Sequence, residues 1–237
     1  MTTIPAYCIR LRGSVAAVMD FEQLRESSIK VGNDFTIRAF DAIEPGQVAN
    51  MMTELGLRWT YPWDAPAKCP YSGLTLIPYQ TRDRNARMAC FLSHYALWQG
   101  CIEIGRPVLI FEDDARFIAK VDPVTLMNSG FHAASLNDPR GATRCADRYH
   151  ALLQEDKSKT EVVPVPWVDA APQVPHGLPG HSAYFLRPEL ASKLVNHVEL
   201  FGCWPNDALM CRQLFPGELG CLTNYATKVC GRRSTLA

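Results

Sequence analysis

The sequence predicts a single α/β domain over residues 1–237, with a mixed, mostly parallel β-sheet flanked by helices. Three observations predict it. The chain opens with a strand, helix, strand pattern, a long amphipathic helix lies near its middle, and a continuous apolar run follows that helix directly. Such alternation of strands and helices is typical of parallel sheets. The hydrophobic fraction of 47% is enough for one full core, and residues 230–237 are expected to form a mobile tail.

The N-terminal pattern contains two strands around one helix. Residues 4–11 form a short apolar run bounded by polar residues, as in a buried strand. A helix is expected over residues 20–30, with Asp20 as its N-cap. Residues 35–40 are the second expected strand, and they lead into Asp41. This opening indicates a parallel sheet.

Residues 59–79 have the composition of a loop. Four prolines alternate there with aromatic residues, among them Trp59, Tyr61, Trp63 and Tyr71. Two interpretations stay open. Either the rings pack the loop onto the core, or they form a surface for a ligand, because long loops in compact domains often have a function. Trp63 is the first residue to substitute in a test.

The clearest helix spans residues 84–105. Apolar side chains recur there at three- and four-residue steps, and a glycine and a proline mark its end. The apolar run 108–111 then predicts a central strand that is covered on both faces. This strand delivers three consecutive carboxylates, Glu112, Asp113 and Asp114, at its carboxyl end.

The C-terminal half is predicted to alternate strands and helices. Strands are expected over residues 131–136 and 182–186, and a helix that starts with a proline over 188–197. Asn206 is a candidate N-cap for a last helix that reaches Leu214.

The segments between these elements predict little regular structure. Residues 140–159 are polar and give no clear pattern, and residues 162–179 are rich in proline. His176 and His181 lie among prolines and glycines, so a solvated or capping role is expected for both. Zinc would need more ligands than this loop offers.

The three adjacent carboxylates are electrostatically costly, because like charges in a partly desolvated place destabilise one another. A positive partner is therefore expected beside them. Alternate side chains of a strand point to opposite faces, so Glu112 and Asp114 would share one face. Two carboxylates on one face suit a hard divalent cation such as Mg²⁺ or Mn²⁺, although acidic turns without a metal are common. The carboxyl end of a parallel strand is also where open α/β sheets bind ligands.

Composition argues against several classes of partner. Lys and Arg number 24, as do Asp and Glu, so no net charge favours nucleic acid or an anionic membrane. The nine cysteines include no C-x-x-C pair, which fits reduced thiols in the cytoplasm. We expect no signal peptide and no transmembrane segment, whereas a peripheral contact with a membrane-held substrate would leave no signature. The glycine-rich motifs of dinucleotide and P-loop sites are missing.

The middle of the chain resembles a known family. Cys90, Ser93, His94 and Trp98 on the helix, followed by the strand 108–114 with its acidic end, are similar to the hallmark block of glycosyltransferase family 25. Weaker similarity extends to residues 7–11, 40–42 and 180–186. The chain departs from the family pattern at residues 87–89, which read Arg-Met-Ala where the family has a glycine and a glutamate, and at Arg10, near the place of an asparagine.

The resemblance implies a GT-A-like fold and a metal-dependent reaction. The enzyme would transfer galactose or a related hexose from a UDP-sugar donor to a glycan or other hydroxyl acceptor, as in lipopolysaccharide biosynthesis. A divalent cation, Mn²⁺ or Mg²⁺, would neutralise the leaving diphosphate. The implied metal ligands are Glu112 and Asp114, and the implied donor-binding residues are Asp41, Ser93, His94, Glu112 and Asp113.

The resemblance also implies inversion at the anomeric carbon, which requires a carboxylate base on the acceptor side. Asp207, in the first turn of the last predicted helix, is the expected base, and the family has an acidic residue in a comparable place. The alternative is that Asp207 only stabilises the helix dipole. Asp169 and Glu189 are weaker candidates because no matching motif surrounds them.

Other interpretations stay open. Ser93 and His94 are more often a packed pair than a nucleophile and base, so we expect them to orient the acidic loop or to contact the donor. The aromatic loop 59–79 would stack on a sugar if it is functional. The carboxylates could also serve a Mg²⁺-dependent phosphate hydrolase or nucleotidyltransferase, or the chain could be a glycan-binding relative without turnover.

Overall fold

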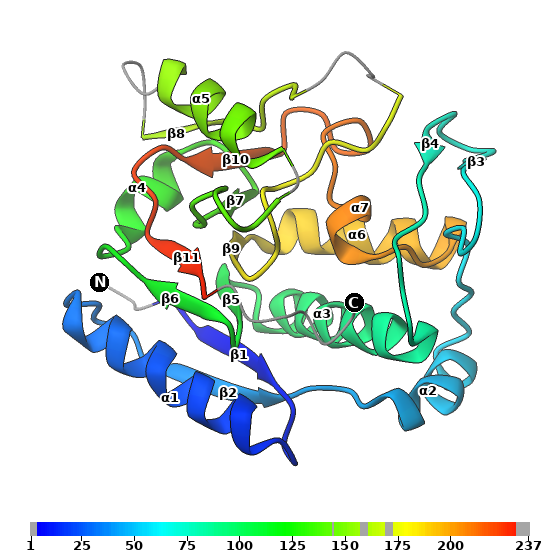
Figure 1. Cartoon of the computed structure of the whole chain (residues 1–237), viewed down its shortest axis with the longest axis horizontal. Helices are drawn as coiled ribbons and strands as arrows, with labels where there is room; N and C mark the ends of the chain where they lie inside the picture. Colours follow the sequence, from blue (N-terminus) through cyan, green and yellow to red (C-terminus); the bar gives the residue numbers. More distant parts are fainter. Residues whose placement is uncertain (1–3, 144, 157–160, 169–172, 231–237) are drawn as a thin grey trace.

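The computed structural model describes residues 4–143, 145–156, 161–168 and 173–230. Its centre is a seven-stranded sheet in the order β2-β1-β5-β9-β7-β10-β8 (Figure 1). The strands of this sheet are β1 (Ala6–Arg10), β2 (Ile37–Asp41), β5 (Val108–Glu112), β7 (Ala133–Ser135), β8 (Val162–Pro164), β9 (Ala183–Leu186) and β10 (Leu219–Leu222).

Strand direction makes the sheet mixed and mostly parallel, which confirms the predicted fold class. β1 pairs parallel with β2 and β5, and β10 pairs parallel with β7. β9 lies between β5 and β7 and runs antiparallel to both, and β8 runs antiparallel to β10 at the edge. The start of β9 therefore meets the carboxyl end of β5: Phe111 pairs with Ala183, and the Glu112 amide donates to the carbonyl of Ser182 at 2.8 Å.

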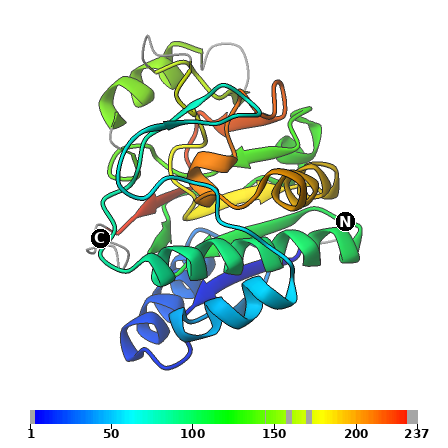
Figure 2. The ribbon, with the colours of Figure 1, turned by 90° about the vertical axis from the view of Figure 1, so that its right-hand side faces the viewer.

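Helices cover both faces of the sheet (Figures 1 and 2). α1 and α4 pack on the face that carries Leu109 and Phe111, whereas α3 and α6 pack side by side on the face that carries Ile110 and Tyr184. The helices are α1 (Val15–Lys30), a 3-10 turn (Pro45–Gln47), α2 (Val48–Glu54), α3 (Arg84–Ile104), α4 (Pro123–Asn128), α5 (Ala146–Asp156), α6 (Pro188–Phe201) and α7 (Asn206–Leu209). Two small antiparallel sheets complete the fold: the hairpin of β3 (Ala67–Lys68) and β4 (Thr75–Leu76), and the pair of β6 (Ala115–Phe117) with β11 (Thr227–Val229). Among the described helices, none has the length and hydropathy that a membrane crossing needs.

α3 matches its prediction closely, for identifiable local reasons. The Asp83 side chain accepts hydrogen bonds from the backbone amides of Asn85 and Ala86, which caps the first turn. The helix ends where Gly105 adopts a left-handed conformation with φ 63°. Phe91 and Trp98 of its apolar stripe are fully buried against the sheet and α6.

Two predicted helix starts were wrong. α1 begins at Val15 with Ser14 as its N-cap, so Asp20 lies inside the helix, where it is buried and pairs with Arg116. The last helix is a single turn rather than a helix to Leu214, and Pro205, not Asn206, occupies its N-cap position. It stops early because Cys211 forms a backbone bridge with Gly177, which redirects the chain.

The regions without a clear prediction also acquire structure. α5 occupies much of the polar stretch 140–159, and the aromatic loop 59–79 contains the β3–β4 hairpin. Of the expected tail 230–237, only Cys230 belongs to the described residues.

Candidate active site

The three carboxylates lie at the carboxyl end of β5, but in a turn rather than in a strand. β5 ends at Glu112, residues Asp113 and Asp114 form a turn, and the chain re-enters a strand at Ala115. Strand alternation therefore does not apply to Asp114, and that part of the same-face argument was wrong. The turn is held from the C-terminal side, because the Cys230 amide donates to the Asp114 carbonyl at 3.0 Å.

The positive charge nearest this turn is already engaged elsewhere. Arg116 donates from Nη1 to the backbone carbonyls of Asp113 and Ala115, both at 2.7 Å. Its Nη2 pairs with Asp20 Oδ1 at 2.7 Å and with Gln23. Arg116 thus fastens the turn to α1 through the backbone and does not pair with the side chains of the turn.

The carboxylates are consequently short of a cation. Burial raises the pKa of Asp114 to about 7, and the charges of Glu112 and Asp113 add to that rise. Burial, followed by the charge of Glu112, likewise raises the pKa of Asp113 to about 6. The Asp114 Oδ1 atom is buried and has no hydrogen-bond partner among the described residues. Hard oxygen donors with an unsatisfied buried atom fit a divalent cation.

His94 orients Glu112 through a chain of buried hydrogen bonds. The indole N–H of Trp98 can only donate, so the Tyr184 hydroxyl accepts it at 3.0 Å. The hydroxyl hydrogen then points to His94 Nδ1, at 2.9 Å. A neutral imidazole that accepts at Nδ1 carries its proton on Nε2, which lies 3.0 Å from Glu112 Oε1 and donates to it. His94 is fully buried, and its contact holds Oε1 of Glu112 in place.

Ser93 on α3 and Asp41 lie near the carboxyl end of β2, which β1 separates from β5. The Ser93 hydroxyl donates to the Ala89 carbonyl at 2.8 Å and accepts from the Ile43 amide at 2.9 Å, which ties α3 to the segment after β2. Ser93 is fully buried. Asp41 is half exposed at the end of β2, 3.9 Å from Arg10 and 3.7 Å from Arg12.

Cys90 connects the turn to α7. Its Sγ lies 4.0 Å from Asn206 Oδ1, and possible ligand atoms of Cys90, His94 and Glu112 lie within 4.8 Å of one another. Burial raises the pKa of the Cys90 thiol well above its ordinary value. Because the thiol keeps its proton and His94 Nε2 donates one, a metal in this cluster would have to displace both protons. We interpret the cluster as a packed hydrogen-bonded group beside the turn.

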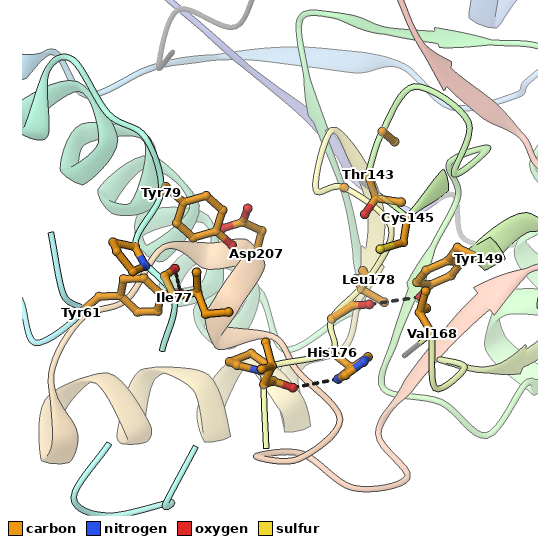
Figure 3. Close-up of a pocket in the computed structure, with 16 residues that line it drawn as sticks. Tyr61, Ile77, Tyr79, Thr143, Cys145, Tyr149, Val168, His176, Leu178 and Asp207 are labelled. Carbon is orange, nitrogen blue, oxygen red and sulfur yellow. Dashed lines mark hydrogen bonds between the residues drawn. The ribbon is translucent and has the colours of Figure 1, made fainter. Parts of the chain in front are cut away.

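Asp207 lies at a pocket of about 420 Å³ beside this cluster (Figure 3). Tyr61 and Tyr79 line the pocket on one side, and His176 and Tyr149 line it on the other. The Asp207 Oδ1 atom is buried without a hydrogen-bond partner among the described residues. Burial raises the pKa of Asp207, while the charge of Arg87 and the hydroxyl of Tyr79 oppose that rise.

The aromatic loop contributes two different sets of rings. Trp59 and Trp63 stack on one another with centroids 4.9 Å apart, and the Arg84 guanidinium lies 5.3 Å from the Trp63 ring centroid. Neither tryptophan lines the pocket, whereas Tyr61 and Tyr79 do. The loop therefore both packs and lines a cavity, and Trp63 belongs to the packing part.

Several residues were missed or misjudged from sequence. His176 and His181 are buried rather than solvated, with 8% and 5% of their surfaces exposed. The relay through Tyr184 and the influence of Arg87 on Asp207 were missed, because in each case the two residues are distant in the chain. Of the weaker base candidates, Glu189 is exposed at the start of α6, and Asp169 lies outside the described residues.

This arrangement defines a class of protein. The mixed α/β sheet with a carboxylate turn after β5 agrees with the GT-A-like fold class expected from the sequence. The chain belongs to glycosyltransferase family 25, because the sequence model of this family, described as an LPS biosynthesis protein, matches residues 36–210. No curated protein matches the chain significantly.

Two solved structures are similar in outline. Mouse xyloside xylosyltransferase 1, in its apo form, has 9% sequence identity and a TM-score of 0.44, with 92% of this chain and 84% of that chain covered. The glycosyltransferase GlyE of Streptococcus pneumoniae TIGR4 has 13% identity and a TM-score of 0.40. That alignment covers 93% of this chain but only 45% of GlyE.

Proposed function

We propose that this glycosyltransferase moves galactose or a related hexose from a UDP-linked donor to a hydroxyl group of a glycan, with inversion at the anomeric carbon. The observation that carries the proposal is a pair of acidic groups with separate environments. Asp114 in the turn and Asp207 in the pocket each have a buried Oδ1 atom without a partner among the described residues. The Asp114 carboxylate suits a cation, and the Asp207 carboxylate suits a proton.

Glu112 and Asp114 would hold the divalent cation, Mn²⁺ or Mg²⁺. When bound, this cation neutralises charge that develops on the leaving diphosphate. His94 holds Glu112 through Oε1, so its second oxygen is left for the cation. Asp113 after β5 and Asp41 at the end of β2, two strands that β1 separates, would face the donor.

Asp207 would accept the proton of the acceptor hydroxyl. A carboxylate whose pKa is raised by burial is a stronger base than an exposed one, which favours proton transfer near neutral pH. Tyr61 and Tyr79 offer aromatic faces in the same pocket, and such faces stack on the apolar side of a sugar ring. The pocket is therefore the proposed acceptor site.

The family description favours a lipopolysaccharide-type glycan as the acceptor. All nine cysteines are free, which fits a reducing cytoplasm. We place the reaction there, with a peripheral approach to an acceptor held in a membrane.

Thermal denaturation with UDP and Mn²⁺ tests this proposal. Ligands that bind the folded state stabilise it by about 2.7 kcal/mol at a hundredfold excess over Kd. UDP with Mn²⁺ together should raise the Tm of the wild type, and UDP alone should not. Asp114→Ala should abolish that rise and reduce turnover of UDP-hexose by far more than tenfold, while the exposed control Asp34→Ala behaves as the wild type. An Asp114→Ala variant that keeps more than about a tenth of wild-type turnover, an effect below about 1.4 kcal/mol, would contradict the metal assignment.

A further inference from the structure

The half-buried guanidinium of Arg87 lies beside the pocket. Arg87 is on α3, one turn before Cys90. Its Nε donates to Thr81 Oγ1 at 2.7 Å, and its Cζ lies 4.6 Å from the centroid of the Tyr79 ring. The hydrogen bond fixes the direction of the group, and the ring supports its plane.

These contacts bring the positive charge to the acidic side of the pocket. Tyr79, on which Arg87 rests, lines the pocket together with Asp207. Of the influences that favour the charged form of the Asp207 carboxyl, Arg87 is the strongest. Arg84, one turn earlier on α3, instead pairs with the exposed Asp64 at 2.7 Å.

Other groups around Asp207 do not supply positive charge in the same way. Desolvation and the charge of Glu112 act against ionisation of Asp207, and the Tyr79 hydroxyl acts for it. The titratable and charged groups that face or surround Asp207 are Tyr61 and Tyr79 from the aromatic loop, Arg87 and Cys90 from α3, Glu112 from β5, Tyr149 and Cys145 near α5, and His176 across the pocket.

We propose that Arg87 is a positioning residue that keeps Asp207 ionised and therefore able to act as the base. This inference rests on the proposed function, in which Asp207 receives the proton of the acceptor. Arg87 need not touch the acceptor for this role. Anchored by Thr81 and Tyr79, it supplies a fixed charge that offsets the desolvation of Asp207.

The titration of Asp207 tests the inference directly. The full-length protein is labelled with ¹³C at the aspartate carboxyls, and Asp207→Asn identifies the Asp207 resonance by its loss. In Arg87→Met, the midpoint of this resonance should move upward by about one pH unit, because an opposite charge nearby lowers a carboxyl pKa by about 1 to 3 units. The midpoint in Arg87→Lys should lie between those of the wild type and Arg87→Met, since this variant keeps the charge and loses the fixed geometry. Arg84→Met is the matched control on the same helix and should leave the midpoint unchanged.

Turnover gives a second readout. The acid limb of kcat/KM for Mn²⁺-dependent UDP-hexose hydrolysis should move by the same amount in Arg87→Met, while KM for the donor stays near the wild-type value. Should Arg87→Met fail to fold, Thr81→Val, which removes the Nε anchor and keeps the charge, should raise the midpoint by a smaller step. Equal midpoints in the wild type and the Arg87 variants overturn the inference. A wild type that hydrolyses no UDP-hexose overturns the proposed function instead, and the titration does not depend on that result.

Discussion

His94 donates a hydrogen bond from Nε2 to Oε1 of Glu112 over 3.0 Å, and it can do so only because Tyr184 occupies Nδ1. The buried relay from Trp98 through Tyr184 to His94 thus ends at the first acidic residue after the central strand. The orientation of the Glu112 side chain at the candidate metal site therefore depends on Tyr184, which is on a different strand.

Tyr184→Phe tests this relay. The change removes one hydroxyl and leaves Trp98 Nε1 and His94 Nδ1, both buried, without their partner. Each unsatisfied buried group costs about 1 to 3 kcal/mol, so the free energy of unfolding should fall by at least about 1 kcal/mol in urea titrations. Tyr95→Phe, whose hydroxyl makes only a 3.5 Å contact with Glu199, is the matched control. Equal losses in both variants would show that the relay contributes nothing special.

Asp207→Asn should reduce the transfer rate about a hundredfold, because the amide keeps the shape of the side chain but cannot accept a proton. Binding of UDP and Mn²⁺, measured by calorimetry, should be preserved. Glu189→Gln is the control, since Glu189 is exposed in the first turn of α6. An unchanged transfer rate in Asp207→Asn would show that Asp207 is not the base and only stabilises the helix dipole.

His181 should make the protein sensitive to mild acid. Burial lowers the pKa of His181 from 6.5 to about 3, and both ring nitrogens lack a hydrogen-bond partner among the described residues. The unfolded chain therefore binds a proton that the folded chain does not, and stability is lost as pH falls from about 6.5 towards 3. At pH 4.5 the loss from this one group is about 2 to 3 kcal/mol.

The slope of stability against pH checks this prediction. His181→Phe should flatten the dependence between pH 6.5 and 4.5, whatever constant offset the new side chain adds through packing. Urea midpoints at several pH values give the slope for each variant. A slope in His181→Phe as steep as in the wild type would assign the acid sensitivity to other groups.

Trp63→Ala should affect stability more than substrate binding. Trp63 lies between Trp59 and Arg84 and does not line the pocket, so the variant should lose about 1 to 3 kcal/mol of stability. Tyr61→Leu, by contrast, alters a pocket wall and should raise KM for a substrate several-fold. A clear rise of KM in Trp63→Ala, with KM unchanged in Tyr61→Leu, would indicate that the tryptophans and not the pocket tyrosines bind the sugar.

The elements that local sequence determines were predicted well. α3 is long and carries its own cap residues, and β5 is a continuous apolar run, so the signals for both lie within a few residues of each element. The prediction broke down where the backbone turns. Glu112 and Asp114 were placed on one face by strand alternation, but the strand stops at Glu112.

Burial of isolated polar residues was the other weak point. His181 lies among glycine and proline, which suggests a solvated loop, yet it packs against Tyr184 and is influenced by His94. Asp207 and Arg87 are likewise far apart in the chain. No local pattern carries such information, because it depends on which segments the sheet brings together.

The position of β9 has a consequence for synthesis on the ribosome. Because β9 lies between β5 and β7, the N-terminal strands β2, β1 and β5 leave one edge of β5 open until residue 186 has emerged. An open edge of apolar strand is prone to pair with other chains, so nascent chains that stall before β9 are those most exposed to aggregation. Docking of β9 closes that edge and, in the same step, brings Tyr184 to His94.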